Sequence, residues 1–322
     1  MNLNKIFDAF PPPKFLDTPF AGLYISDTAI RCIKFGRKGG ILYIVKYTEK
    51  VIPAGVVTSG QINKREELLE MLSAIKKDLD LDFVRVSLPE EKAYLFTAKI
   101  PMVKPKEVYS AIESKIEENV PVVPSELIFD YNLGEQRHDG NLGVVVSALP
   151  ITIIESYTSI VSDAGMSPLS LEIESQAIAR ALIKSDALGV VLIVHFRPGK
   201  VGLYVVNNRI VHFTSTIPLK TPVLDNPDFL LQEIKKLYTY WHTLKENVNK
   251  VERNIVQIIA CGESFDEAVI PYLAAHNDTP VAFGNVWTNA FDVNSTVPEI
   301  SFADSLRFST PVGLALPMNI LV

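Results

Sequence analysis

The sequence has little of what several classes of protein require. Among 322 residues there are two cysteines and five histidines, and lysine and arginine form no block. Cys32 and Cys261 lie far apart in apolar strand-like runs, so they indicate buried free thiols rather than a zinc site. A net charge of −6 without a basic stripe argues against nucleic-acid binding.

Long apolar runs and recognisable catalytic motifs are also lacking. No run reaches the ~18 residues that a membrane-spanning helix needs. Residues 1–19 form an N-terminal extension that has Asp8 and three prolines where a signal peptide would be apolar. With so few cysteines, this predicts a cytoplasmic protein. No Ser/His/Asp order, metal-ligand spacing or Walker-type loop occurs, so no catalytic or metal-binding residue is assigned.

The chain does contain an internal repeat on the scale of a domain. Segments 20–35 and 41–52 read as a β-hairpin, which a helical pattern and a further strand follow. A second β-meander begins near residue 190 and is again followed by helices. The pattern predicts an α/β fold of two related halves with a small α/β module inserted in the first.

Several stretches, taken in order, resemble one known family. They are "GLYISDTAIRCIKF", "VIPAGVVTSGQINKREELLEML", "ENVPVVPSELIFDYNLGEQ", "AGMSPLSLEIESQAIARAL" and "VQIIACGESFDEAVIPYLAA". Together they resemble the type IV pilus assembly protein PilM family, relatives of the cell-division protein FtsA within the actin-like ATPase superfamily.

This resemblance implies an actin-like (ribonuclease H-like) duplicated fold and a set of boundaries. The expected units are an N-terminal extension (1–19), a first actin-like subdomain (20–89), an inserted α/β domain (90–165), a connecting strand and helix (166–185), a second actin-like domain with a reduced outer subdomain (186–302), and a C-terminal segment returning to the first domain (303–322).

The resemblance also implies partners. PilM-like proteins lie in the cytoplasm, peripheral to the inner membrane, and hold the short cytoplasmic tail of PilN beside other pilus motor components. The tail lies between the first subdomain and the insert. Here the expected groove has walls from the insert helix 107–120 and from strands near 84–89 and 95–101. Self-association stays open.

The phosphate loops depart from the family pattern. Tyr24 stands at the acidic position of the first loop and Ser26 at its glycine, and Arg31 replaces the usual lysine. In the second loop, His195 replaces the acid and Arg197 the glycine. Pro198 then removes a backbone donor from an anion cradle that depends on such donors.

Other positions that match the family near the cleft keep some polar character. A glycine survives on the adenosine side, although Glu263 replaces a second one there, and an acidic position is kept at Glu174. The residues that could still contribute to a degenerate nucleotide site are Ser26, Asp27, Thr28, Arg31, Glu174, Gly199, Lys200, Gly262, Glu263 and Ser264.

These departures predict a scaffold with a degenerate nucleotide site, a pseudo-ATPase for which no cofactor is expected. Metal and positioned donors supply most of phosphoryl-transfer catalysis, and losing one such donor costs ~10²-fold or more in rate. Two alternatives stay open. One is a working ATP-dependent switch whose rearranged magnesium site uses Asp27, Thr28 and Lys200. The other is an FtsA-like filament former at the membrane.

Overall fold

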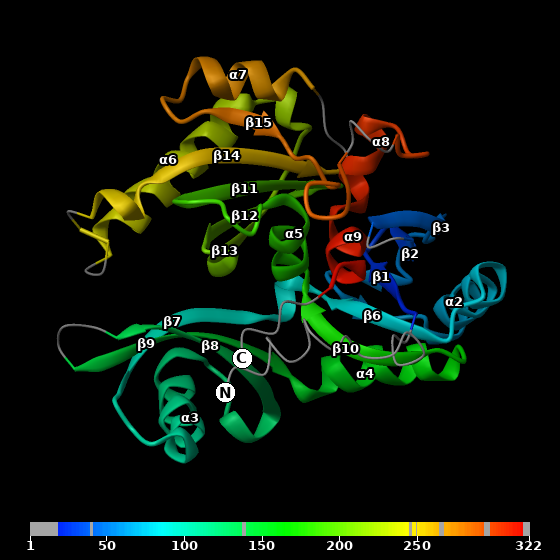
Figure 1. Cartoon of the computed structure of the whole chain (residues 1–322), viewed down its shortest axis with the longest axis horizontal. Coiled ribbons are helices and arrows are strands. Elements are labelled where there is room, and N and C mark those ends of the chain that lie inside the picture. Colours follow the sequence, from blue (N-terminus) through cyan, green and yellow to red (C-terminus); the bar gives the residue numbers. More distant parts are fainter. Residues whose placement is uncertain are drawn as a thin grey trace.

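The computed structural model of the chain contains two five-stranded sheets, helices between and outside them, and a smaller three-stranded module (Figure 1). The structure describes residues 19–38, 41–136, 140–244, 247–248, 250–263, 267–292 and 297–317. Residues 1–18 of the predicted N-terminal extension and residues 318–322 of the predicted C-terminal segment lie outside these ranges.

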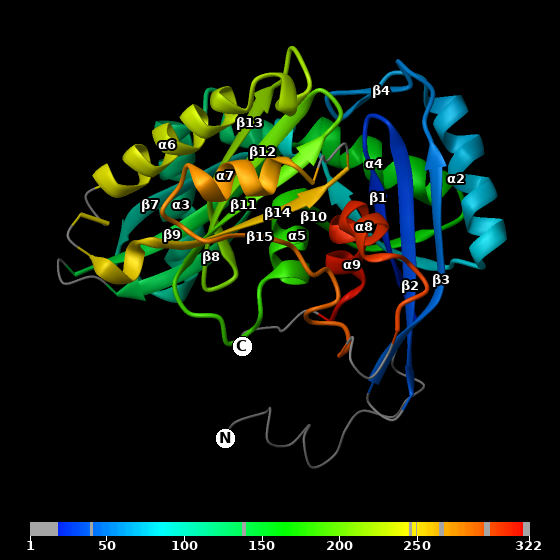
Figure 2. The same ribbon diagram turned by 90° about the horizontal axis from the view of Figure 1, so that it is seen from above.

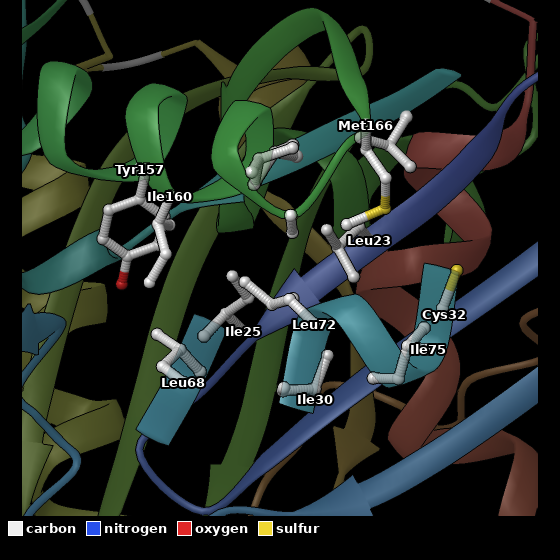
Figure 3. Packing of buried hydrophobic residues seen from close by; sticks show 14 of the residues in the cluster. Leu23, Ile25, Ile30, Cys32, Leu68, Leu72, Ile75, Tyr157, Ile160 and Met166 are labelled. Carbon is white, nitrogen blue, oxygen red and sulfur yellow. The ribbon is translucent and has the colours of Figure 1, made fainter. Parts of the chain in front are cut away.

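The first sheet has the strand order β10-β6-β1-β2-β3. Three antiparallel strands follow one another along the chain, and β6 and β10 then add parallel to β1. Two amphipathic helices cover one face, and their side chains meet those of β1 and β2 in a buried cluster (Figure 3). The elements are β1 (Ala21–Ile25), β2 (Ala29–Lys38), β3 (Ile41–Val51), β6 (Phe83–Leu88), β10 (Ser167–Ile173), α2 (Arg65–Leu79) and α4 (Ile151–Asp163).

The second sheet repeats this plan. Its order is β13-β12-β11-β14-β15, with an antiparallel meander first and parallel strands after it. Since the two orders correspond strand for strand, the halves share one topology. The elements are β11 (Val190–Arg197), β12 (Lys200–Asn207), β13 (Ile210–Pro218), β14 (Ile255–Gly262), β15 (Val281–Phe283), α6 (Pro227–Thr243) and α7 (Val269–Ala275).

Two helices, α5 (Glu174–Leu182) and α9 (Ser309–Ala315), lie between the sheets and join them (Figures 1 and 2). Their side chains share a buried cluster with β11, β14 and the loop after β15, where Trp287 is 2% exposed and stacks on Phe291. The core is therefore continuous through the junction of the halves. The short helix α8 (Phe302–Ser305) precedes α9.

The inserted module is a three-stranded antiparallel sheet, order β7-β9-β8, with one helix on one face. It comprises β7 (Tyr94–Pro101), α3 (Val108–Asn119), β8 (Leu127–Gln136) and β9 (Asn141–Pro150). The small remaining elements are β4 (Val57–Thr58), β5 (Gln61–Ile62), and the 3₁₀ helices η2 (Glu90–Lys92), η3 (Pro105–Glu107), η4 (Pro124–Glu126), η5 (Val223–Asp225), η6 (Val251–Arg253) and η7 (Leu306–Phe308).

One boundary of the insert differs from the predicted range 90–165. Helix α4 falls inside that range, yet its buried residues, among them Tyr157 and Ile160, belong to the core of the first sheet. The module with its own core therefore ends at Pro150, where β9 passes into α4. Sequence periodicity identifies an amphipathic helix but not the sheet that its apolar face meets.

The close contact of α5 with α9 depends on Gly313. A Cβ at this position would overlap the carbonyl oxygen of Ala177. We expect Gly313→Ala to lower the free energy of unfolding by about 1–3 kcal/mol through overpacking, measured by urea denaturation. Gly36→Ala is the control, because a Cβ there would meet only the side chains of Tyr43 and Val45. Equal stability of the two variants would contradict a tight α5–α9 contact.

Candidate functional site

The loops of the predicted nucleotide cleft face each other across the junction of the two halves. The β1–β2 turn carries Asp27, and the β11–β12 hairpin carries Lys200; the Lys200 Nζ lies 2.8 Å from the Asp27 Oδ2. The hollow between them has a volume of only about 20 Å³, which is room for about one water molecule. The space is filled by the chain's own charged side chains.

Backbone donors of the first turn are already engaged. The Ser26 hydroxyl accepts hydrogen bonds from the backbone N–H groups of Thr28 (3.2 Å) and Ala29 (2.9 Å). A phosphate cradle needs such N–H groups aimed outward at the anion. The serine that replaces the family's glycine therefore uses the donors that a phosphate would use.

Lys200 is fixed by carboxylates from the first half. Its Nζ lies 2.5 Å from Glu91 Oε1 in addition to its contact with Asp27. Burial alone would raise the pKa of Asp27, but its hydrogen bonds from Lys200 and the Gly60 N–H lower that pKa below its ordinary value. The carboxylate is thus ionised and fully committed to protein donors.

Arg197 is the buried centre of the cluster. Its Nη1 donates to Glu91 Oε1 (2.9 Å) and to Glu174 Oε2 (3.1 Å), and only 5% of its side chain is exposed. Burial would lower the pKa of Arg197, but the adjacent carboxylates, Glu174 foremost, raise it. Burial raises the pKa of Glu174, and Arg197 opposes that rise. The guanidinium therefore favours the charged form of this buried carboxyl group and opposes the effect of burial.

A second group of ion pairs links β14 to the first sheet. The carboxylate of Glu263 accepts hydrogen bonds from Arg31 and, at 3.2 Å, from the Thr28 hydroxyl. Arg31 also donates to Glu49 Oε1 through Nε (2.9 Å) and Nη2 (2.7 Å). Arg31 is almost fully buried. Here too a cation that the sequence assigns to the nucleotide site is paired within the protein.

The two predicted glycines meet backbone requirements in the structure, Gly199 of a turn and Gly262 of a close contact between strands. Gly199 has φ +71° and follows Pro198 at the β11–β12 turn, the arrangement of a type II turn. Gly262 has φ +111°, and a Cβ there would overlap the backbone of Phe196. Its freedom lets the end of β14 close on β11. Ser264 lies outside the described residues.

His195 is a structural residue here. It is fully buried, 3.3 Å from the Tyr204 hydroxyl, and burial followed by the charge of Arg197 lowers its pKa well below the ordinary value. The ring is therefore neutral at physiological pH, and its hydrogen bond to Tyr204 lies within the core.

The structure brings together several residues that the sequence predicts for the nucleotide site: Asp27, Thr28, Arg31, Lys200 and Glu263. Sequence reasoning missed Glu91 and Glu49. The available signal was the pair Glu90–Glu91 directly after strand β6 and Pro89, since polar residues at the carboxyl ends of parallel strands gather at such sites. Across the described ranges, no group of three or more His, Cys, Asp or Glu side chains is placed to hold a metal ion.

A second and much larger hollow of about 870 Å³ lies between the insert and the first sheet. Strand β8 forms one wall and strand β10 the other, and each is the edge of its own sheet. Leu88 of β6 lines it as expected, but helix α3 and strand β7 do not, because α3 packs on the other face of the insert sheet. We call this hollow the β8–β10 groove. Its lining includes Ile128, Asp130, Asn132, Leu149, Ser170, Leu171, Glu172, Gln176, Arg180, Asn208 and Arg209.

Comparison with known proteins identifies the family. The sequence matches the family described as Type IV pilus assembly protein PilM over residues 22–190, more than half of the chain. The chain belongs to this PilM family. No curated protein matches its sequence.

The fold is similar to that of solved structures. The protein is similar to the structure titled PilM-PilN type IV pilus biogenesis complex, with 15% identity, a TM-score of 0.75, and coverage of 92% of this chain and 98% of that one. A more distant similarity is to the ethanolamine utilization protein EutJ from Carboxydothermus hydrogenoformans, with 13% identity, a TM-score of 0.47, and coverage of 95% of this chain and 90% of that one. Another is to the cytoplasmic domain of EpsL of Vibrio cholerae, with 9% identity, a TM-score of 0.48, and coverage of 85% of this chain and 100% of that one.

The predicted actin-like α/β fold is thereby confirmed. In the described part of the PilM-family chain, no helix is both long and apolar enough to cross a membrane.

We expect Arg197→Met to lower the free energy of unfolding by about 3–5 kcal/mol, because it leaves Glu174 buried without a counter-charge. The loss should be greater at pH 8 than at pH 5. Burial raises the pKa of Glu174. Without Arg197 the carboxyl group therefore keeps its proton at pH 5, and only at pH 8 does an unpaired buried charge destabilise the folded state. Chemical denaturation at both pH values measures this.

Two further variants complete that test. Arg197→Met combined with Glu174→Gln should regain most of the stability, since no buried charge is then left alone. Arg65→Met breaks the exposed ion pair with Asp163 and should cost under about 1 kcal/mol. If Arg197→Met behaves like Arg65→Met, the buried pair does not hold the halves together.

Proposed function

We propose that this PilM-family chain is a cytoplasmic scaffold of a type IV pilus or related assembly machine, peripheral to the inner membrane, and that it binds the short cytoplasmic tail of a PilN-like protein. The observation that carries the proposal is the contrast between two sites. The β8–β10 groove is open at about 870 Å³, whereas the hollow between the two phosphate loops, at Asp27 and Lys200, measures about 20 Å³.

The cleft does not fit a nucleotide with magnesium. Its turn donors are used by Ser26, and Lys200 and Arg197 stand among the carboxylates where phosphates would need free cations. Opening it would break buried charge pairs, and separating such a pair costs several kcal/mol. We therefore propose a pseudo-ATPase, and no catalytic step is assigned to these residues.

The groove suits an extended peptide. Edge strands present unpaired backbone N–H and C=O groups, and a peptide can add to such an edge as a further strand. Alternate residues of β8, Ile128 and Asn132 among them, face the groove, while Leu127 packs in the insert core. Leu149 and Leu171 add apolar lining. The similar structure is a complex of PilM with PilN, which supports a PilN-like tail as the occupant.

Calorimetric titration tests the proposed loss of nucleotide binding. We expect no binding heat from ATP up to millimolar concentration, with or without magnesium, because the positions of the phosphates are taken by ion pairs. The same preparation should bind the tail peptide described below, which shows that it is folded and competent. Micromolar, magnesium-dependent binding that Asp27→Ala abolishes would instead support an ATP-dependent switch.

Fluorescence anisotropy with a labelled peptide of the PilN-like tail from the same organism tests the groove. Ile128→Asp should weaken binding at least about tenfold (~1.4 kcal/mol), since a charge replaces apolar lining. Leu133→Asp is a matched control on the same strand: Leu133 is 51% exposed against 49% for Ile128, and it does not line the groove. Equal effects of both variants, or no binding by the unmodified protein, would rule out this site.

A further inference from the structure

The β8–β10 groove has an uneven distribution of charge. The charge of Arg180 is neutralised by Glu172, whose carboxylate accepts hydrogen bonds from Nη1 and Nη2 of the guanidinium. The Gly313 carbonyl oxygen accepts a further hydrogen bond from Nη1. Two charged groups of the lining form no ion pair within the described ranges: Asp130 on strand β8 and Arg209 at the β12–β13 turn. The groove thus has an anionic wall on the insert and a cationic end on the second half.

The position of Arg209 is unusual for its residue type. The strands β12 and β13 are joined by the two residues Asn208 and Arg209, which have φ +50° and +63°. A two-residue hairpin of this kind strongly favours glycine at its second position. A long cationic side chain is kept there against a backbone preference, and such outliers concentrate at binding sites.

The guanidinium of Arg209 has no hydrogen-bond acceptor among the described residues. Arg209 is half-buried and lines the groove, and no described side chain or carbonyl accepts a hydrogen bond from it. Burial, and then the charge of Arg180, lowers its pKa, so its surroundings supply positive charge rather than a counter-ion. Strand β13 lies over the insert sheet (Figure 1), which places the turn at the groove rather than in open solvent.

We propose that the peptide held in the β8–β10 groove carries an acidic side chain, and that Arg209 binds it. This rests on the proposed function and adds the chemistry of the partner. A carboxylate meets the fork of guanidinium donors in a charge-assisted hydrogen bond. The carboxylate of Asp130 repels an acidic residue at the β8 wall, so the acidic side chain points to the β12–β13 end and fixes the register of the peptide.

The experiment uses the PilN-like tail peptide and two sets of variants of it. In one set each acidic residue is replaced in turn by glutamine, and in the other by lysine. Affinities are measured by anisotropy for the unmodified protein, for Arg209→Gln and for the control Arg37→Gln, which alters an exposed arginine on strand β2.

One acidic position should matter to the unmodified protein. Its change to glutamine should weaken binding about tenfold or more, and its change to lysine should weaken binding further. The Arg209→Gln variant should bind the native tail about tenfold more weakly than the unmodified protein does. This variant should bind the glutamine peptide and the native tail with equal affinity. Arg37→Gln should behave as the unmodified protein does.

A second variant separates binding from folding. Arg209→Gly removes the cation and relieves the left-handed backbone, so it should unfold at the same or a higher denaturant concentration while losing the preference for the acidic peptide. If the tail binds in a manner sensitive to Ile128→Asp but indifferent to its acidic residues, this inference is overturned and the proposed function stands. If no tail peptide binds, both fail.

Discussion

The guanidinium of Arg197 lies between Glu91 of the first half and Glu174 at the start of the joining helix α5, and this contact ties the second half to the first. In a low-dielectric interior a buried cation and its partners must remain together, because separating them leaves charges without solvent or counter-ion. Around it, Lys200 with Asp27 and Arg31 with Glu263 repeat the same pattern. The charged side chains of the predicted nucleotide cleft are thereby paired with one another across the junction.

The ion-pair cluster and the β8–β10 groove are built on the same elements. Strand β10 ends at Ile173 and helix α5 begins at Glu174, so Glu172 faces the groove while Glu174 reaches Arg197. On the neighbouring strand, Leu88 lines the groove and Glu91 follows it into the cluster. A rigid cluster therefore gives the groove a wall of fixed position. That suits the proposed scaffold role, since a site that needs no rearrangement binds its partner best.

Much of the fold could be predicted because local sequence patterns indicate its strands and helices. The alternation in the two meanders and the periodicity of α2 and α6 are properties of short windows, and their repetition along the chain indicated a duplicated fold. The limit of the insert could not be predicted, since the apolar face of α4 fits either of two neighbouring cores. Only the packed structure decides between them.

The candidate site shows the same division. Resemblance to the family located Asp27, Lys200 and Glu263, since their positions follow known loops. It could not reveal that Asp27 pairs with Lys200 and that Glu263 pairs with Arg31, because charges so far apart in sequence leave no local pattern. Glu91 has a local signal in its place directly after strand β6 and Pro89, but the sequence does not show that it meets Arg197 and Lys200. The turn residue Arg209 was missed because its backbone conformation has no signature in composition. The boundaries predicted for the remaining domains stay predictions.

The place of Trp287 gives the molecule a built-in optical reporter. The chain has only two tryptophans, and both belong to the second half: Trp287 in the cluster around α5 and α9, and Trp241 on the buried face of helix α6. Both indole rings are nearly inaccessible to water. Tryptophan emission therefore reports hydration of the second half and of the junction, whereas the core between the first sheet and helices α2 and α4, and the core of the insert, contain no tryptophan. A difference between emission and circular dichroism during unfolding would show which half gives way first.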